Sequence, residues 1–570
     1  MFGFGDEIMN LDSINKIIND AFLENGYKND TKIIKSNRPD LCDYQCDDIF
    51  KMCKMYHESP NKIGTSVVNS INSIDNFSDY FSEVTFCPPG FINIKLSDKF
   101  INQYINDMIT NPKFNIKEAN KTYFLDYGGP NIAKPLHVGH LRTAIIGESL
   151  KRIIKFKGNK TISDVHLGDY GLQIGEVIYG IINDNLSYDD ITLEYLEYIY
   201  PKMSKLCKEN KEILDECALI TKKLQDGDLT YHKYFEKICE VSIRDIKRLY
   251  NFLDVSFDLW LGESDSYKYI DSLTNLLNSK NLLKESNGAL VIDVKKESDT
   301  KEIPPLIYQK SNKAYLYATT DLATIYDRVK YHPDYILYIT DLRQSLHFET
   351  VFRASKLAGL TDNITLKHLG YGTVNDLSGK PFKTRNGDAA KLDDLFMQVR
   401  KSFIDIKEEN NLLSSKDLDI IVNSIIKFAD LQNNYERDYI FDINKFSKVV
   451  GKTGPYILYT YLRMNKIINE NVITKPTLNN TIYNEYDRNL RLKLMELNLA
   501  VDLAFNELRP NYVADYLYDL CVLDNIFYQN NHINSVSEDK KQEWLVLIDL
   551  TNKVIKQLLN LLVIDIPSKM

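Results

Sequence analysis

The sequence predicts an α/β protein with a doubly wound parallel sheet, an α+β domain before it and an all-α helical bundle after it. Short apolar strand patterns alternate with helical patterns over residues 121–180 and again over residues 310–404, as they do in a parallel sheet. After about residue 405, strand patterns almost vanish and long helical patterns replace them, as in a bundle. The length of 570 residues exceeds what one core supports, so several domains are expected.

The composition is typical of a soluble globular protein. Hydrophobic residues make up 44% of the chain and charged residues 26%, unlike a disordered chain. The net charge of −9 argues against indiscriminate nucleic-acid binding but leaves room for a local basic surface. Eight irregularly spaced cysteines fit reduced thiols better than a disulfide framework. No signal segment or membrane span is recognisable, so we expect a cytoplasmic location.

Residues 1–120 are expected to form a separate small domain. It mixes short helical patterns with a strand pattern at Gly90–Leu96 and a helix from Ser97 to Ile109. It also contains one group of potential zinc ligands: Cys42, Cys46, Cys53 and His57. Their spacing is not that of common zinc modules, and two of the four fall on an amphipathic helical pattern, so we prefer a structural role and predict no protein-bound metal.

The sheet is expected to begin with Tyr123–Tyr127. Gly128, Gly129 and Pro130 then mark a turn, and helical periodicity continues to a basic last turn at Lys157-Gly158. Three more strands are expected: Thr161–Val165, Tyr335–Thr340 and Leu366–Tyr371.

His137 and His140 fall at the entrance of the helix after the first strand. Free backbone N–H groups and the helix dipole favour phosphate there, and Gly139 lets a nucleotide approach the backbone closely. By themselves the four residues fit a helix cap with two surface histidines equally well. Other polar groups also follow strand ends, namely Asp169, Asp341 and the Lys380–Arg385 loop, and ligands of doubly wound sheets bind at that edge. We therefore expect these groups to converge on one crevice.

The rest of the chain is expected to be mostly helical. An insertion at residues 181–309 carries amphipathic helical patterns rich in Lys, Glu and Tyr. The bundle, residues 405–570, has five helical patterns: Leu418–Leu431, Ile443–Asn469, Tyr486–Leu508, Tyr512–Gln529 and Glu543–Ile564.

Five segments of the chain together form one recognisable pattern. The first runs from Asp126 through Gly175 and contains His137-Val-Gly-His140. Four more follow it in order: Tyr317–Ala323, Asp341–His347, Gly379–Gly387 and Gly454–Tyr459. In sequence and in order, these segments resemble the arginyl-tRNA synthetases, a family of class I aminoacyl-tRNA synthetases whose "HIGH" signature corresponds to His137–His140.

The resemblance implies a Rossmann-like catalytic domain at residues 121–180 and 310–404, interrupted by the 181–309 insertion. It also implies that residues 1–120 contact tRNA near its D-loop and that residues 405–570 bind the anticodon. The implied activity is that of an arginine–tRNA ligase. L-arginine and ATP give arginyl-adenylate and pyrophosphate, and the arginyl group then moves to the 3′ end of tRNA(Arg). Mg²⁺ bound with ATP and a need for tRNA during activation are further implications, and we expect no other cofactor and a monomer.

The resemblance assigns catalytic roles to six residues: His137, His140, Lys134, Lys380, Lys383 and Arg385. Neither step needs a protein nucleophile, since positioning and charge stabilisation are sufficient. The histidines donate to phosphate oxygens, and the loop cations close over the triphosphate. Thr384 stands where the family-wide "KMSKS" pattern has its second lysine, and Lys134 is expected to supply the missing charge. Alternatively, Lys380, Lys383 and Arg385 belong to a flexible surface loop that has no catalytic role.

The resemblance also implies the ligand-binding residues. Those for ATP are Gly139, Asp341, His347, Gly370, Gly372 and Val374, and those for arginine are Asp126, Asn131, Glu263, Tyr317, Asp321 and Gln344. A guanidinium presents five donors and needs such acidic and carbonyl acceptors. Tyr317 and Asp321 share a helix face, although Asp321 is alternatively an N-cap. His347 is alternatively a helix-surface histidine.

Four residues are candidates for tRNA contact: Tyr456, Tyr459, Arg463 and Met570. Aromatic rings beside a cation suit the stacking of unpaired bases, although most tyrosines in bundles belong to the core. The resemblance places the last methionine near the anticodon loop.

Three other functions share features with this sequence. Gly451-Lys452-Thr453 looks like the end of a P-loop, but the first glycine of that motif would fall at Phe446 and no strand precedes it. Another class I synthetase or adenylyl-transferring ligase would share the histidine pair. A non-catalytic RNA-binding relative would have no need to keep the histidines, Asp321 and the cationic loop together.

Overall fold

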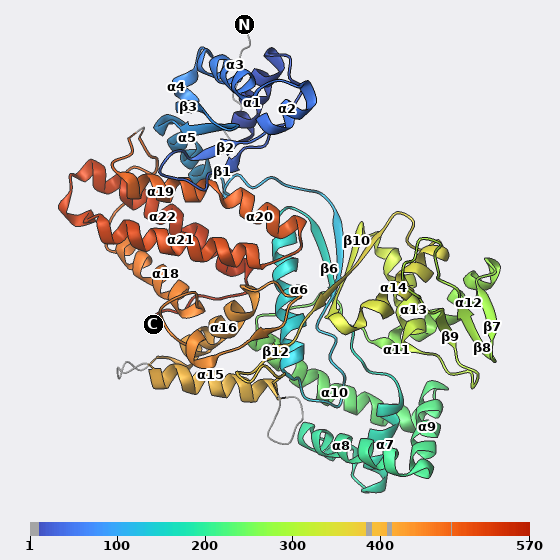
Figure 1. The fold of residues 1–570 in the computed structure, drawn as a ribbon. Helices are drawn as coiled ribbons and strands as arrows, with labels where there is room; N and C mark the ends of the chain where they lie inside the picture. The colour runs from blue at the N-terminus through green and yellow to red at the C-terminus, as the bar shows by residue number, and fades with distance from the viewer. Residues whose placement is uncertain (1–10, 383–389, 407–412, 480) are drawn as a thin grey trace. The chain divides into compact units, whose positions relative to one another are not determined.

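The computed structural model describes residues 11–382, 390–406, 413–479 and 481–570 (Figure 1). The chain forms two compact units. One contains residues 1–117, 460–502 and 516–557, and the other contains residues 118–459, 503–515 and 558–570. In the described ranges, every helix is too short or too polar to span a membrane.

The N-terminal region is an antiparallel sheet packed with helices. Its strands are β1 (Ile34–Lys35), β2 (Tyr44–Cys46), β3 (Phe81–Cys87) and β4 (Phe91–Leu96), in the order β1-β2-β4-β3. Its helices are α1 (Leu11–Glu24), α2 (Ile49–Tyr56), α3 (Pro60–Asn72), α4 (Phe77–Tyr80) and α5 (Asp98–Thr110). The predicted strand and the helix after it are confirmed as β4 and α5. Ser97 is the N-cap of α5, since its side chain accepts a hydrogen bond from the Phe100 N–H.

The three cysteines of the potential zinc group lie in the interior of this region or on one of its helices. Cys42 and Cys46 are buried, and the Cys42 thiol donates to the Ser36 hydroxyl at 3.2 Å. Cys53 lies on α2, which ends at its C-cap His57. Within the described ranges, no group of three or more His, Cys, Asp or Glu side chains is placed to hold a metal ion.

The second unit is built on a four-stranded parallel sheet. Its strands are β5 (Thr122–Asp126), β6 (Lys160–Asp164), β10 (Tyr335–Asp341) and β11 (Thr365–Tyr371), in the order β11-β10-β5-β6. All four predicted strands are confirmed. The chain moves outward in one direction from β5 to β6 and in the other from β10 to β11. The direction therefore switches between β5 and β10, and ligands of such sheets bind at the carboxyl ends of the two strands that meet there.

Helices cover this sheet. The helix predicted after the first strand is confirmed as α6 (Val138–Phe156), which packs across β5, β6 and β10. Two others, α13 (Tyr317–Arg328) and α14 (Ser345–Leu357), join Phe124, Ile336 and Tyr338 of the sheet in a separate core cluster. The doubly wound α/β prediction is thereby confirmed.

The insertion combines helices with a small sheet that was not predicted. It follows α7 (Leu172–Asn183), and its helices are α8 (Leu193–Glu209), α9 (Lys211–Gln225), α10 (Leu229–Phe252), α11 (Glu263–Ser266) and α12 (Ile270–Ser279). Its antiparallel strands are β7 (Leu283–Ser286), β8 (Ala289–Ile292) and β9 (Leu306–Gln309). The strand β7 is exposed over most of its length, so its sequence lacks the apolar alternation that marks a half-buried strand.

The C-terminal region is helical, as predicted, but some of its helices begin and end at other residues than predicted. Its helices are α15 (Leu392–Ile406), α16 (Ser415–Leu431), α17 (Ile443–Phe446), α18 (Gly454–Asn469), α19 (Glu485–Met495), α20 (Leu497–Asn506), α21 (Asn511–Asn530) and α22 (Glu538–Leu561). The predicted continuous helix Ile443–Asn469 is wrong, because the chain turns between α17 and α18, where Gly451 has φ +77°. The pattern Tyr486–Leu508 is likewise divided into α19 and α20. A short parallel pair, β12 (Val374–Asn375) with β13 (Tyr439–Ile440), was also not predicted.

Candidate active site

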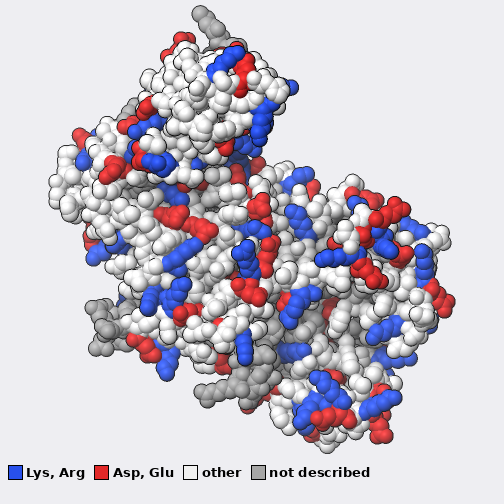
Figure 2. All heavy atoms as spheres, viewed as in Figure 1, with Lys and Arg blue, Asp and Glu red and all other residues white. Residues whose placement is uncertain are grey.

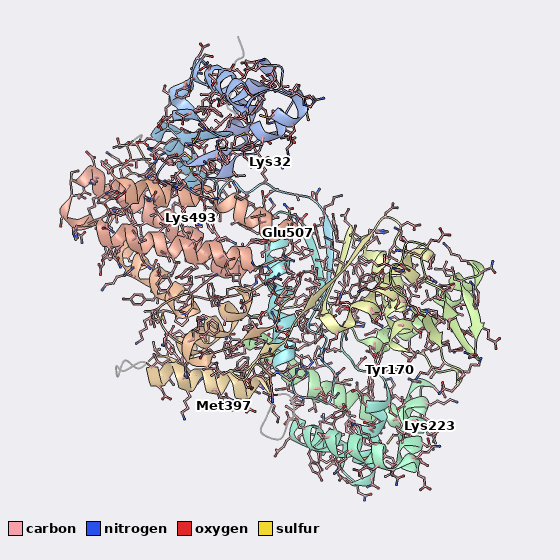
Figure 3. All side chains as sticks on the ribbon, in the orientation of Figure 1. Lys32, Tyr170, Lys223, Met397, Lys493 and Glu507 are labelled. Atoms are coloured by element: carbon pink, nitrogen blue, oxygen red, sulfur yellow. The ribbon has the colours of Figure 1, made fainter. Side chains whose placement is uncertain are left out.

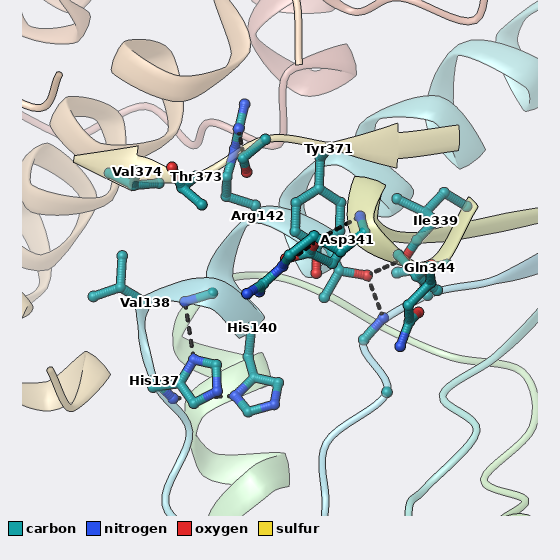
Figure 4. A pocket seen from close by; sticks show the side chains of 18 of the residues that line it. His137, Val138, His140, Arg142, Ile339, Asp341, Gln344, Tyr371, Thr373 and Val374 are labelled. Atoms are coloured by element: carbon teal, nitrogen blue, oxygen red, sulfur yellow. Dashed lines mark hydrogen bonds and ion pairs between the residues drawn. The ribbon is translucent and has the colours of Figure 1, made fainter. Parts of the chain in front are cut away.

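The two histidines meet at the N-terminus of α6. His137 is the N-cap, and its Nδ1 accepts a hydrogen bond from the Gly139 N–H at 3.0 Å. The His140 Nδ1 accepts from the His137 N–H at 3.1 Å, and the ring centroids lie 3.8 Å apart (Figure 4). Since each Nδ1 is an acceptor, each neutral ring carries its proton on Nε2. Both imidazoles therefore keep an Nε2–H donor for a ligand.

Both imidazoles are neutral at pH 7. Burial lowers the pKa of His137, and the charge of Lys134 lowers it further. Burial holds the pKa of His140 well below its usual value, with added repulsion from His137 and Lys134. Because the neutral forms persist below the ordinary histidine pKa, the two donors are available throughout the neutral range.

A cavity of about 390 Å³ opens at the carboxyl ends of β5 and β10. Eight of the predicted residues line it: Asp126, His137, Gly139, His140, Asp341, Gln344, Gly372 and Val374. The expected convergence holds for the histidines and Asp341 but not for Asp169, which does not line the cavity. Instead, the Asp169 carboxylate accepts hydrogen bonds from the backbone N–H and hydroxyl of Ser264.

Three glycines around the cavity permit close approaches. A Cβ on Gly139 would lie 2.8 Å from the His137 ring, so glycine makes room for the imidazole. A Cβ on Gly370 would lie 2.9 Å from the Leu342 Cα, and one on Gly372 would lie 2.7 Å from the Arg437 backbone. Gly370 does not itself line the cavity, so its predicted ATP contact stays a prediction.

A second group of predicted residues gathers around α11 and α13. Asn131 pairs with Gly168 in an isolated bridge, and the Glu263 N–H donates to the Leu167 carbonyl at 2.9 Å. Glu263 begins α11, which packs against α13, the helix that starts with Tyr317. The Leu167–Asp169 segment therefore brings these residues together, although none of them lines the cavity wall described above.

Tyr170, which is labelled in Figure 3, lies beside this second group. Tyr170 follows Asp169, and its ring centroid lies 4.5 Å from that of Tyr267, which comes directly after α11. The pKa of the neighbouring Glu263 is raised to about 8, chiefly by burial, with the charges of Asp321 and Asp169 adding to the rise and His166 opposing it. Glu263 is therefore mostly protonated at pH 7 when nothing is bound.

Asp321 lies inside α13, whose N-cap is Leu316. The alternative that Asp321 is the N-cap is therefore wrong. Its Oδ2 lies 2.5 Å from the Nε2 of His347, which is on the first turn of α14. His347 contacts the predicted arginine ligand and does not line the cavity, so its predicted ATP role stays a prediction.

A buried charged cluster lies beneath the cavity, and sequence reasoning missed most of it. Arg328 pairs with Asp126 at 2.6 Å and with Asp164 at 3.0 Å, and all three side chains are buried. His166 Nδ1 lies 3.7 Å from Asp164. Burial opposes the charged form of His166, but the Asp164 and Asp126 carboxylates outweigh it and raise its pKa to about 9. Asp126 is thus engaged by Arg328, and its role as an arginine ligand stays a prediction.

The lysines and the arginine predicted to bind phosphate lie in different surroundings. The Lys134 ammonium lies 4.4 Å from the centroid of the Tyr200 ring, which belongs to α8. Lys380 is exposed, and its N–H donates to Asp376 in a turn. Lys383 and Arg385 lie outside the described residues.

The predicted tRNA contacts lie in the helical region. Tyr456 and Tyr459 are on α18, and Tyr459 is 45% exposed. The guanidinium of Arg463 lies 5.1 Å from the Tyr528 ring centroid. Just before Met570, the N–H and hydroxyl of Ser568 donate to Asp417 on α16. The segment Gly451–Thr453 follows α17 rather than a strand, so it lacks the context of a P-loop.

A doubly wound sheet, with a histidine pair at the first helix N-terminus and a cavity between the central strands, defines a class I aminoacyl-tRNA synthetase fold. Residues 105–443 match the family described as tRNA synthetases class I (R), catalytic domain. Residues 457–570 match the DALR anticodon binding domain, and residues 11–96 match the arginyl tRNA synthetase N terminal domain. The chain therefore belongs to the arginyl-tRNA synthetase family.

Relatives and solved structures agree with this family. The chain is 41% identical over 584 residues to an arginine–tRNA ligase of Alkaliphilus oremlandii, covering 98% of this chain and 99% of the relative. It is 37% identical to that of Agathobacter rectalis, with coverage of 98% and 99%. The arginyl-tRNA synthetase structure from Plasmodium falciparum matches with a TM-score of 0.82 at 26% identity, covering 98% of this chain and 99% of that one. That of Thermus thermophilus, at 19% identity and a TM-score of 0.81, covers 98% and 100% and supports the fold.

Proposed function

We propose that this protein is an arginine–tRNA ligase that uses ATP. The observation that carries the proposal is the cavity at the ends of β5 and β10, into which the two neutral histidines bring their Nε2–H donors. Its volume of about 390 Å³ is within the range of small-ligand sites. We infer the other two substrates, arginine and tRNA, from the membership of the family.

In the first step, a carboxylate oxygen of arginine attacks the α-phosphorus of ATP. The bond from that phosphorus to the β,γ-diphosphate oxygen breaks, and pyrophosphate leaves with Mg²⁺ as part of the substrate. His137 and His140 donate hydrogen bonds to phosphate oxygens on which negative charge develops. Lys134 and the Lys380–Arg385 loop add positive charge on the phosphate side.

In the second step, a ribose hydroxyl at the 3′ end of tRNA attacks the carbonyl carbon of the adenylate. The carbonyl–phosphate bond breaks, AMP leaves, and the hydroxyl proton leaves with the phosphate or water. No side chain forms a covalent bond in either step, so the site acts by positioning and charge stabilisation.

We assign the selection of arginine to the predicted residues that gather around α11 and α13. Asp321 and Glu263 supply carboxylates for the guanidinium, and Tyr317 borders them. Asn131 and Gln344 are assigned to the amino and carboxylate groups of arginine. Asp321 uses Oδ2 for His347, so its Oδ1 is the oxygen we assign to the substrate.

The tRNA is assigned to the helical region and the N-terminal domain. The visible face carries Lys and Arg side chains interspersed with Asp and Glu rather than one basic field (Figure 2). Such a surface favours recognition by local contacts over charge alone, and Tyr456, Tyr459, Arg463 and Met570 are the candidates for it. A monomer in the cytoplasm is part of the same proposal.

The test is arginine-dependent ATP–pyrophosphate exchange by the full chain in the presence of tRNA. His137→Asn and His140→Asn should each lower the exchange rate by about 100-fold, because each removes one charge-stabilising donor. His232→Asn is the matched control, since His232 lies on α10 with 47% of its side chain exposed. Unchanged exchange in both site variants would refute the assignment.

A further inference from the structure

Arg142 follows the histidine pair on α6, yet its side chain is fully buried. Its Nη1 donates to the Gly372 carbonyl at 2.7 Å and to the Arg437 carbonyl at 3.3 Å. Its Nε forms an ion pair with Asp430 of α16 at 2.9 Å. One guanidinium thus joins three segments of the chain: the helix of the histidines, the residue directly after β11, and α16 together with the residues that follow it.

Aromatic rings enclose this guanidinium. Its central carbon lies 5.2 Å from the ring centroid of Tyr439 and 5.9 Å from that of Tyr371. Arg142 lies near Tyr371 and Thr373, and all three line the cavity (Figure 4). A planar, always charged group between two rings has little freedom to move.

The segment that Arg142 holds is a wall of the cavity. Gly372, Thr373 and Val374 line the cavity together with the histidines. The Gly372 N–H donates to the Tyr435 carbonyl at 2.9 Å, and the Thr373 N–H donates to Asp438 at 2.6 Å. The 372–374 wall is therefore hydrogen-bonded to residues 435–440. Arg142 donates hydrogen bonds to both segments, to Gly372 in the wall and to Arg437 behind it.

We propose that Arg142 is a positioning residue that sets the separation between the phosphate-binding histidines and the 372–374 wall, and thereby the affinity for ATP. This inference rests on the proposed function, because it takes ATP as the ligand of the cavity. Lysine cannot replace arginine there, since one ammonium lacks the planar fork that reaches Gly372, Arg437 and Asp430 together.

The test is Arg142→Lys, which keeps the charge and removes the fork. In pyrophosphate exchange, the KM for ATP should rise by about tenfold or more, whereas the KM for arginine should stay within about twofold. If Arg142 served only to stabilise the fold, its replacement would not raise the KM for ATP selectively over the KM for arginine. Arg491→Lys is the matched control. Arg491 is also fully buried and pairs with Asp487 at 2.6 Å, but it belongs to the other compact unit, so both constants should stay unchanged.

Asp430→Asn gives an independent check if Arg142→Lys does not fold. It keeps an acceptor for Nε and removes one charge, so the KM for ATP should rise less but in the same direction. Equal changes in the two Michaelis constants, or no change in either, would overturn the positioning role. Failure of the proposed function would look different, because the unmodified protein itself would then show no arginine-dependent exchange.

Discussion

Raising the pH from 7 to 8.5 should tighten arginine binding, because Glu263 loses its proton over this range. Burial raises the Glu263 pKa to about 8, with Asp321 and Asp169 adding to the effect and His166 opposing it. A guanidinium is held by an ionised carboxylate. At pH 7, arginine must therefore displace a proton from Glu263 before the pair can form.

The magnitude follows from that pKa. About one tenth of Glu263 is ionised at pH 7 and about three quarters at pH 8.5, so the KM for arginine should fall about eightfold. His166, whose pKa is about 9, begins to lose its positive charge in the same range. Because the charge of His166 lowers the Glu263 pKa, its loss makes the fall in the arginine KM somewhat smaller.

The assay is pyrophosphate exchange with tRNA and saturating ATP at pH 7.0, 7.75 and 8.5. Glu263→Gln should flatten most of the pH dependence of the arginine KM, leaving the smaller part due to the substrate's own amino group. The KM for ATP, measured in parallel, should change little. If Glu263→Gln keeps the full eightfold slope, Glu263 is not the group that titrates and the reasoning is refuted.

Four further predictions test other parts of the site. Lys134→Ala should lower exchange by about tenfold with unchanged circular dichroism, and full activity would remove Lys134 from the mechanism. Asp321→Asn should raise the KM for arginine at least about tenfold and leave the KM for ATP within about twofold, whereas equal losses would indicate misfolding. Exchange should persist as the pH falls to about 6.5, because the pKa values of His137 and His140 are lowered; a decline that starts above pH 7 and is absent from His137→Asn would contradict this. Removing Met570 should slow tRNA charging while helicity stays constant, and unaltered charging would exclude it from tRNA contact.

The sheet and the histidine pair could be predicted because their signals are local. The strand β5, the turn after it and α6 are encoded in one continuous stretch, and Gly158, with φ +82°, ends the helix where the sequence indicates. The class signature then fixes His137 and His140 at the helix entrance. These features depend on hydrogen bonds between residues a few positions apart.

The charged groups beneath the site could not be predicted because their partners are distant in the chain. Arg328 bonds to Asp164, 164 residues away, and Arg142 bonds to the carbonyl of Arg437, 295 residues away. In the sequence these arginines look like polar positions on amphipathic helices. Only the folded chain shows that they are buried and surrounded by acceptors. His166 was within a recognised segment, but its charge depends on Asp126 and Asp164.

The most direct measurement is pyrophosphate exchange by the purified full-length chain with each standard amino acid in turn, with and without tRNA. The class I fold, the neutral histidine pair and the acidic residues around α11 and α13 predict exchange with arginine and with no other amino acid, and the family resemblance implies that the exchange depends on tRNA. Exchange with a different amino acid in place of arginine, or with none of them, would contradict the proposed activity.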